Sequence, residues 1–227
     1  MNELFIFDKS KTVLLKAILP MLILLHHLNG VTALTYLKPF GVVGIAVVSL
    51  FFFVSGYGLL ASFEKKGILY LESFFKKRVL PIVCTYIGAL ALYLLFRAIV
   101  YGGGIVEYLK ATNFTNWLPY SWFVIELLIL YIFYWGFFRI KRMSIKSKIT
   151  LSVSIICLCY FVMMYWDAPI YLWRSTPAFA LGMIYKYNER LVLKCGRLMM
   201  ILSVVVACML FGIVNVLKFR VYVDSCG

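Results

Sequence analysis

Apolar residues follow one another along this chain in long unbroken runs instead of alternating with polar residues. The runs are about twenty residues long, which is the length of helix that crosses a hydrocarbon core of roughly 30 Å. The pattern predicts an all-α fold, a polytopic bundle of about seven transmembrane helices. The predicted spans are residues 13–33, 40–62, 79–101, 121–138, 149–166, 171–187 and 197–217.

The composition excludes several other classes of protein. Hydrophobic residues make up 64% of the 227 residues and charged residues 14%, whereas a soluble domain carries about a quarter charged residues. An aromatic content of 18% is too high for a disordered chain. The six cysteines lie mostly inside apolar runs and lack metal-site spacing, so we expect no metal. No repeat or linker divides the chain, which predicts one membrane-embedded domain over residues 1–227.

Positive charge gathers on one side of the predicted spans. The formal net charge is +14, and most of the 23 Lys and Arg residues fall in the loops on the side of the N-terminus. Loops rich in Lys and Arg lie in the cytoplasm. The N-terminus is therefore predicted to be cytoplasmic, in a multi-pass membrane protein. Because topology and the lipid bilayer account for the charge, we expect no nucleic-acid partner.

Ionisable side chains inside spans are costly and therefore indicate function. His26 and His27 are the only histidines of the chain, and imidazole is suited to proton transfer near neutral pH. Lys16 precedes His27 by eleven residues, which places both on one helix face, whereas His26 lies about 100° away and is predicted to point outside the same cavity. The alternative is a neutral histidine hydrogen-bonded between helices, with Lys16 as a plain anchor at the inner face.

Glu126 is the one carboxylate well within a predicted span, and it needs a partner there. Pairing with His27 would orient the imidazole, as in a nucleophile, base and orienter set. Pairing with Arg97 or Arg174 would instead form a structural ion pair. Both pairings remain open from the sequence.

Three further segments attract attention. Ser55 lies beside Gly56 in the second span, where small residues let a helix or a ligand approach the backbone, and helix packing is the more common use. Lys76, Lys77 and Arg78 would hold the phosphates of a nucleotide-bearing donor, although topology and anionic lipid also explain them. The outer segment 102–120 carries aromatic and amide side chains that suit either a substrate mouth or interfacial anchors.

Several motifs follow one another in a characteristic order between residues 16 and 182. They are Lys16 and His27 separated by ten residues, the run Gly41–Gly56 with its aromatic residues before Ser55 and Gly56, the basic segment Phe75–Pro81, the pair Trp122 and Phe123, and the stretch 174–182. This order resembles the acyltransferase-3 family of bacterial integral membrane acyltransferases, in which an arginine, ten residues and a histidine mark the first span. Lysine replaces that arginine here and lacks its bidentate fork.

The resemblance implies a membrane-bound O-acyltransferase that moves an acyl group, commonly acetyl, to a hydroxyl of a cell-envelope carbohydrate or similar acceptor. The resemblance also implies acyl-coenzyme A as the donor substrate, no bound cofactor, and a location in the bacterial cytoplasmic (inner) membrane. The expected site residues are His27, Lys16 and Glu126 for catalysis, Lys76, Lys77 and Arg78 for the donor, and Ser55, Trp122 and Arg174 for the cavity wall.

Two alternatives to an active enzyme are compatible with the same sequence. Members of the family typically have about ten spans, so we expect this chain to be incomplete at its C-terminal end, and an inactive truncated remnant is one alternative. The other is a carrier or exporter of an envelope precursor, with Arg97, Glu126 and Arg174 along its route. Only an enzyme forms an acylated product, so an assay of transfer separates it from both.

Overall fold

The computed structural model describes residues 9–32, 34–102 and 104–193, and this part of the chain is helical with no strand. The chain forms two compact units, residues 1–184 and 185–227. The longer helices are α1 Lys9–Val31, α2 Val43–Lys66, α4 Leu80–Tyr101, α6 Trp122–Phe138, α7 Ile145–Tyr165 and α8 Thr176–Tyr187. The shorter elements are η1 Thr35–Val42, α3 Ile68–Glu72, η2 Phe75–Val79, α5 Ile105–Ala111, η3 Phe114–Asn116 and η4 Ile170–Leu172.

The predicted membrane helices are confirmed in part. Among the described residues, α2, the continuous helix 75–101 and α7 are long and apolar enough to cross a membrane, while 17–31 of α1 and all of α6 form shorter apolar helices. The 12 residues of α8 extend about 18 Å, less than a hydrocarbon core. Seven spans and a cytoplasmic N-terminus stay predictions, and the predicted span 197–217 lies outside the described residues.

Two predicted spans begin later than expected because a short element precedes each helix. Residues 35–42 form the 3-10 turns of η1 around Pro39, and α2 begins only at Val43. Proline has no backbone N–H to donate to a preceding turn, which favours a break at this point. In the same way, η4 and a turn precede α8, which begins at Thr176. These two breaks place irregular backbone at one end of the helices.

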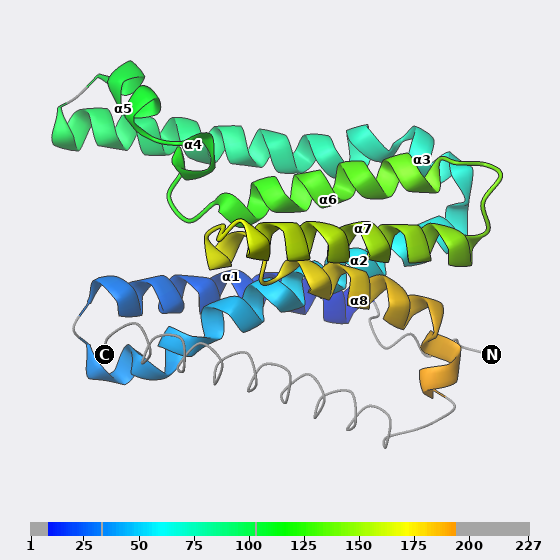
Figure 1. The fold of residues 1–227 in the computed structure, drawn as a ribbon. Helices are drawn as coiled ribbons and strands as arrows, with labels where there is room; N and C mark the ends of the chain where they lie inside the picture. The colour runs from blue at the N-terminus through cyan, green and yellow to red at the C-terminus, as the bar shows by residue number, and fades with distance from the viewer. Residues whose placement is uncertain (1–8, 33, 103, 194–227) are drawn as a thin grey trace. The chain divides into compact units, whose positions relative to one another are not determined.

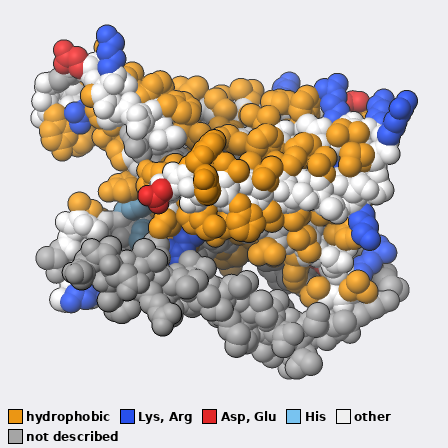
Figure 2. All heavy atoms as spheres, in the orientation of Figure 1, with side chains coloured by type: hydrophobic (Ala, Val, Ile, Leu, Met, Phe, Trp, Pro, Cys, Tyr) orange, Lys and Arg blue, Asp and Glu red, His pale blue; other side chains and the backbone are white. Residues whose placement is uncertain are grey.

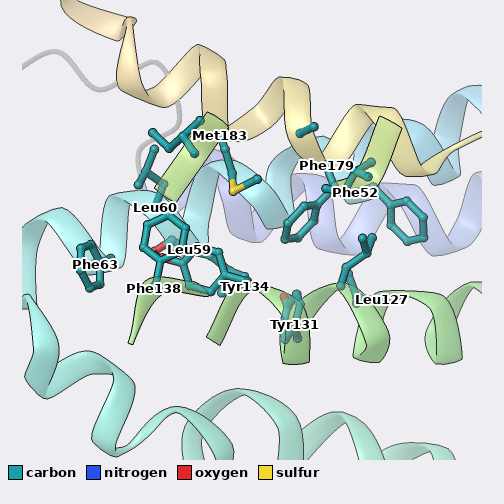
Figure 3. Close-up of a cluster of buried hydrophobic side chains, with 14 of the residues drawn as sticks. Phe52, Leu59, Leu60, Phe63, Leu127, Tyr131, Tyr134, Phe138, Phe179 and Met183 are labelled. Atoms are coloured by element: carbon teal, nitrogen blue, oxygen red, sulfur yellow. The ribbon is translucent and has the colours of Figure 1, made fainter. Parts of the chain in front are cut away.

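Aromatic and aliphatic side chains from α2, α6 and α8 form the centre of the core (Figure 3), and residues of α3 and α7 extend it. Phe52, Phe138 and Met183 are completely buried there. In water, burying a side chain of this size stabilises a fold by about 1.5–3 kcal/mol. In a membrane the lipid is as apolar as the core, so the stabilisation comes mainly from packing contacts between the helices. The core therefore fixes how α2, α6 and the first turns of α8 lie against one another.

Two glycines let α2 and α8 approach until their backbones touch. A Cβ atom added to Gly56 would collide with the carbonyl oxygen of Phe179, and one added to Gly182 would collide with the carbonyl oxygen of Phe53. Gly58, two residues along α2 from Gly56, has open space at the same position. Helix packing therefore explains Gly56.

The ends of α2 and α6 lie together with η2 at one end of the helices (Figure 1). The Tyr134 hydroxyl donates to the Leu59 carbonyl at 3.0 Å, and the Trp135 indole donates to the Leu71 carbonyl at 3.1 Å. We call this the basic end, because its loops and helix termini expose Lys65, Lys66, Lys76, Lys77, Arg139, Lys141, Arg142 and Lys146. Figure 2 shows that apolar side chains cover much of the surface between the helix ends, while Lys and Arg gather mainly at the ends.

A buried lysine joins α6 to α7 at the basic end. The ammonium of Lys148 donates to the carbonyl oxygen of Phe138, the last residue of α6, at 2.8 Å. The same ammonium lies 5.2 Å from the centre of the Phe63 ring. Lys148 therefore satisfies a terminal helix carbonyl that has no partner within its own helix.

Lys148→Met is expected to lower the free energy of unfolding by about 1–3 kcal/mol, because the apolar chain still fills the space but the Phe138 carbonyl loses its charged donor. Heating the detergent-solubilised protein while following tryptophan fluorescence measures this loss. Lys146→Met, at an exposed position on the same helix, is the control and should change stability by less than about 0.5 kcal/mol. Equal effects of the two substitutions would contradict the role of Lys148.

Candidate functional site

A cavity of about 580 Å³ lies at the end of α1 and the beginnings of α2 and α6. We call this the histidine end. The lining of the cavity includes His26, His27, Gly44, Tyr120, Trp122 and Tyr171. These residues come from four places far apart in the sequence: α1, α2, the chain around the start of α6, and η4. The walls are mostly aromatic and aliphatic, with few polar groups, as is typical of a small-molecule site.

His27 lies against Tyr120 in this cavity. The two ring centroids are 3.9 Å apart and the ring planes differ by 29°, which is a stacked arrangement. Tyr120 holds its backbone at a φ of 62°, a left-handed conformation that costs a non-glycine residue about 1–2 kcal/mol. Strain of this kind persists where the surrounding structure enforces it, commonly at functional sites. The loop before α6 is thus shaped so that an aromatic ring covers the imidazole.

His26 lines the same cavity, so the prediction that it points elsewhere is wrong. Its ring centroid lies 5.2 Å from that of His27. The prediction considered only the angle between neighbouring residues on an ideal helix. Because η1 and α2 fold back against the last turns of α1, while the loop before α6 covers another side of them, the cavity extends around more than one face of α1.

Two contacts fix the His26 ring. Nδ1 lies 2.9 Å from the carbonyl oxygen of Phe40, and a carbonyl only accepts, so Nδ1 carries the proton and donates it. The other nitrogen, Nε2, lies next to Gly44, where an added Cβ atom would be only 2.5 Å away. Glycine at this position makes room for the ring.

Lys16 lies on α1 about 16 Å before His27 along the helix axis, if eleven residues each rise 1.5 Å. Its side chain lies outside the described residues. The predicted alignment of Lys16 with His27 therefore stays a prediction.

Glu126 lies on the face of α6 that carries two cavity residues. It follows Trp122 by four residues and Phe123 by three, spacings that place side chains on one helix face. Both carboxylate oxygens are buried and have no hydrogen-bond partner among the described residues. Neither of the predicted pairings of Glu126, with His27 or with an arginine, is formed. A buried acid of this kind is costly to maintain for structure alone.

Of the three residues predicted to line the cavity, Trp122 does so, while Ser55 and Arg174 are not among the lining residues. The Ser55 hydroxyl donates to the Phe51 carbonyl at 2.8 Å, within its own helix. Arg97 packs over the ring of Tyr108 at 4.1 Å, outside the cavity. A carrier route through this cavity would require Arg97, Glu126 and Arg174 along its walls, and none of the three is a lining residue.

The predicted donor-binding residues lie at the basic end, in the π-helical turn η2. Lys76 and Lys77 are exposed. Arg78 is half-buried, donates to the Ser62 hydroxyl at 3.0 Å and lies 5.6 Å from the centre of the Tyr70 ring. Burial raises the pKa of Tyr70, and the positive charge of Arg78 opposes that rise. The two lysines are thus available to a ligand, while Arg78 is already engaged in packing.

The outer segment folds mostly on itself. Tyr108 donates its hydroxyl to the Trp117 carbonyl at 3.2 Å, and the Trp117 indole donates to the Leu109 carbonyl at 3.1 Å. Of its aromatic residues, Tyr120 alone reaches the lining of the cavity. Within this segment, Tyr120 is thus the aromatic residue placed to meet a ligand in the cavity, and the role of the others stays a prediction.

Sequence reasoning missed the two residues that hold His26, Phe40 and Gly44. The available signal was the small residue Gly44 near the start of the second apolar run, a place where a bulky side chain can approach the backbone. Tyr171 was also missed, since nothing in the local sequence connects η4 with the first helix.

The fold and the cavity define a helical membrane protein with two histidines in an aromatic pocket at its helix ends. The family model of the acyltransferase-3 family, described as an acyltransferase domain, matches residues 13–223, and the chain belongs to this family. The match confirms the resemblance found in the sequence and supports a membrane acyltransferase in general. No curated protein and no solved structure matches the chain.

Proposed function

We propose that the protein transfers an acyl group, acetyl in the first instance, from acyl-coenzyme A to a hydroxyl of a cell-envelope carbohydrate or a similar acceptor, in the cytoplasmic membrane of a bacterium. The observation that carries this proposal is the cavity of about 580 Å³ that holds both histidines in a chain of the acyltransferase-3 family. Imidazole is the side chain best matched to proton transfer near neutral pH.

In the proposed reaction, His27 is the general base. A ring nitrogen of His27 takes the proton of the acceptor hydroxyl, and the oxygen attacks the carbonyl carbon of the thioester. The carbon–oxygen bond forms, the carbon–sulfur bond breaks, and the departing sulfur takes the proton from the imidazolium. The products are an ester and free coenzyme A, and His27 returns to its neutral form.

Glu126 is proposed to assist this proton transfer. Its buried carboxyl lies on the α6 face that also carries Trp122 and Phe123, about one helical turn further along the helix. Its carboxyl has no partner among the described residues, and we propose that the pairing with His27, which the resting structure does not form, forms during turnover when the imidazole becomes charged. Lys16 is proposed as the companion basic residue toward the start of α1.

The proposal is tested by incubating the purified protein in lipid nanodiscs with labelled acetyl-coenzyme A and envelope carbohydrate. An acyltransferase forms a labelled, alkali-labile ester at a rate that depends on acceptor concentration. Nanodiscs without the protein provide the background rate. Absence of any ester above this background would contradict the enzyme and leave the carrier or the inactive remnant.

Lys76 and Lys77 are proposed to bind the phosphates of the donor, since both are exposed cations at the basic end. The double substitution Lys76→Gln and Lys77→Gln is expected to raise the KM for acetyl-coenzyme A about fivefold, because each exposed ion pair contributes about 0.5 kcal/mol. The effect should shrink as salt is added. Lys141→Gln, which removes another exposed charge near the basic end, is the control, and an equal rise in its KM would contradict specific binding by the two lysines.

A further inference from the structure

Both ring nitrogens of His26 have defined roles in the geometry of the cavity. Since Nδ1 donates to Phe40 at 2.9 Å, the neutral ring carries its lone pair on Nε2. This is the arrangement by which a second hydrogen bond fixes the tautomer of a functional histidine. His26 is therefore held as a hydrogen-bond acceptor.

The acceptor nitrogen is placed beside the one lining residue that has no side chain. Nε2 lies against Gly44, and both residues line the cavity. Any larger residue at position 44 would occupy the space that the ring now fills, since an added Cβ would lie within 2.8 Å of three atoms of the His26 ring. The hydrogen bond to Phe40 and the space left by Gly44 thus hold the His26 ring at the cavity wall.

The two imidazoles are neighbours in one pocket, with centroids 5.2 Å apart and planes inclined by 61°. Two acceptors this close can each receive a hydrogen bond from one small ligand that carries two adjacent hydroxyls. Two aromatic residues of the same lining, Trp122 and Tyr171, lie next to each other with ring centroids 5.5 Å apart. Such walls suit the carbon-bearing face of a cyclic polyol.

We propose that His26 is a second acceptor-binding residue: its Nε2 receives a hydrogen bond from a hydroxyl adjacent to the one that His27 deprotonates, so the cavity selects acceptors with two neighbouring hydroxyls on a ring. This inference rests on the proposed acyl transfer and deepens it. His26 determines which hydroxyl of the acceptor faces His27. A site built to bind a hydroxyl discriminates against the analogue that lacks it.

The test compares 1,2-cyclohexanediol with cyclohexanol as acceptors, using the full chain in nanodiscs. We expect kcat/KM for the diol to exceed that for cyclohexanol about tenfold, the value of roughly one hydrogen bond. His26→Asn can keep a donor near the position of Nδ1 for the Phe40 carbonyl but places nothing at Nε2. In this variant the preference should fall to about twofold, the statistical factor for two hydroxyls against one, and retention of the tenfold preference would overturn the proposal.

A substitution at Gly44 gives a second test of whether His26 causes the preference for the diol. Gly44→Ala displaces the His26 ring and should also lower the preference for the diol to about twofold. Gly58→Ala, where the added methyl group meets no atom within 4 Å, is the matched control and should keep it. A Gly44→Ala variant that still prefers the diol would count against a fixed His26.

Failure of the proposed function can be separated from failure of this inference. The chain contains two histidines, so ¹⁵N-histidine labelling gives one pair of imidazole signals for each. If no ester forms with either probe or with envelope carbohydrate, the proposed function fails, and hydrogen bonding to His26 is then decided by adding the two alcohols to the labelled protein and following its signals. A change in the Nε2 resonance of His26 on adding diol but not cyclohexanol supports the proposal, and an unchanged resonance overturns it.

Discussion

His27→Ala is expected to lower the rate of acyl transfer by about 10²–10⁴, the usual contribution of a general base. The imidazole of His27 lines the cavity and is positioned by the stacked ring of Tyr120 at 3.9 Å. Alanine removes both the base and the stack. The rate of ester formation from labelled acetyl-coenzyme A, at equal amounts of folded protein in nanodiscs, measures the loss.

His27→Phe distinguishes the loss of the base from the loss of the ring. Phenylalanine keeps a flat aromatic ring against Tyr120 and therefore preserves the stacking, but it has no nitrogen to take a proton. We expect this variant to be as inactive as His27→Ala and more stable than it. An active His27→Phe variant would show that the ring acts through packing, and the assignment of His27 as base would then be wrong.

The histidine cavity shows where sequence reasoning reached its limit. A histidine within an apolar helix is visible in the sequence because burying it is costly. The partners are not visible, since Phe40, which contacts His26, lies in η1 beyond the end of α1, and Tyr120, which stacks on His27, lies more than ninety residues away. Adjacent residues on a helix face different directions, so helix geometry alone predicts that His26 points away from the cavity, which in fact extends around the end of α1.

Ser55 is absent from the cavity lining because its hydroxyl is satisfied within its own helix. A hydroxyl in an apolar helix can satisfy itself by donating to the carbonyl four residues earlier, and Ser55 does this with Phe51. The sequence shows that a polar group is present but not whether its own helix already satisfies it. Arg78 is similar, since its contacts with Ser62 and Tyr70 depend on the fold of η2 against α2.

Most of the helix boundaries were predictable, because they depend on runs of apolar residues that end at charges, glycine or proline. The predicted span 121–138 and the helix Trp122–Phe138 agree within one residue. The grouping of the loops around residues 66–79 and 139–144 at one end also agrees with the predicted topology (Figure 1). The close crossing of α2 and α8 was not predictable, since Gly56 and Gly58 look equivalent in the sequence.

Gly56→Ala is expected to lower the free energy of unfolding by about 3 kcal/mol, the upper range for inserting a methyl group into a packed interior. The added Cβ would collide with the backbone carbonyl of Phe179, and a backbone atom cannot rotate away as a side chain can. α2 and α8 would have to separate, which would loosen the buried packing of Phe52 and Met183. Thermal unfolding in detergent, followed by the fluorescence of the five tryptophans, measures the change.

Gly58→Ala is the matched control, because it adds the same methyl group to the same helix where no atom lies within 4 Å. Alanine is the better helix former, so this variant should unfold at the same temperature as the parent or slightly above it. Gly182→Ala, on the opposite side of the crossing, should resemble Gly56→Ala because its methyl group meets the backbone of Phe53. If Gly56→Ala were as stable as Gly58→Ala, the backbone contact between α2 and α8 would not be the feature that requires glycine.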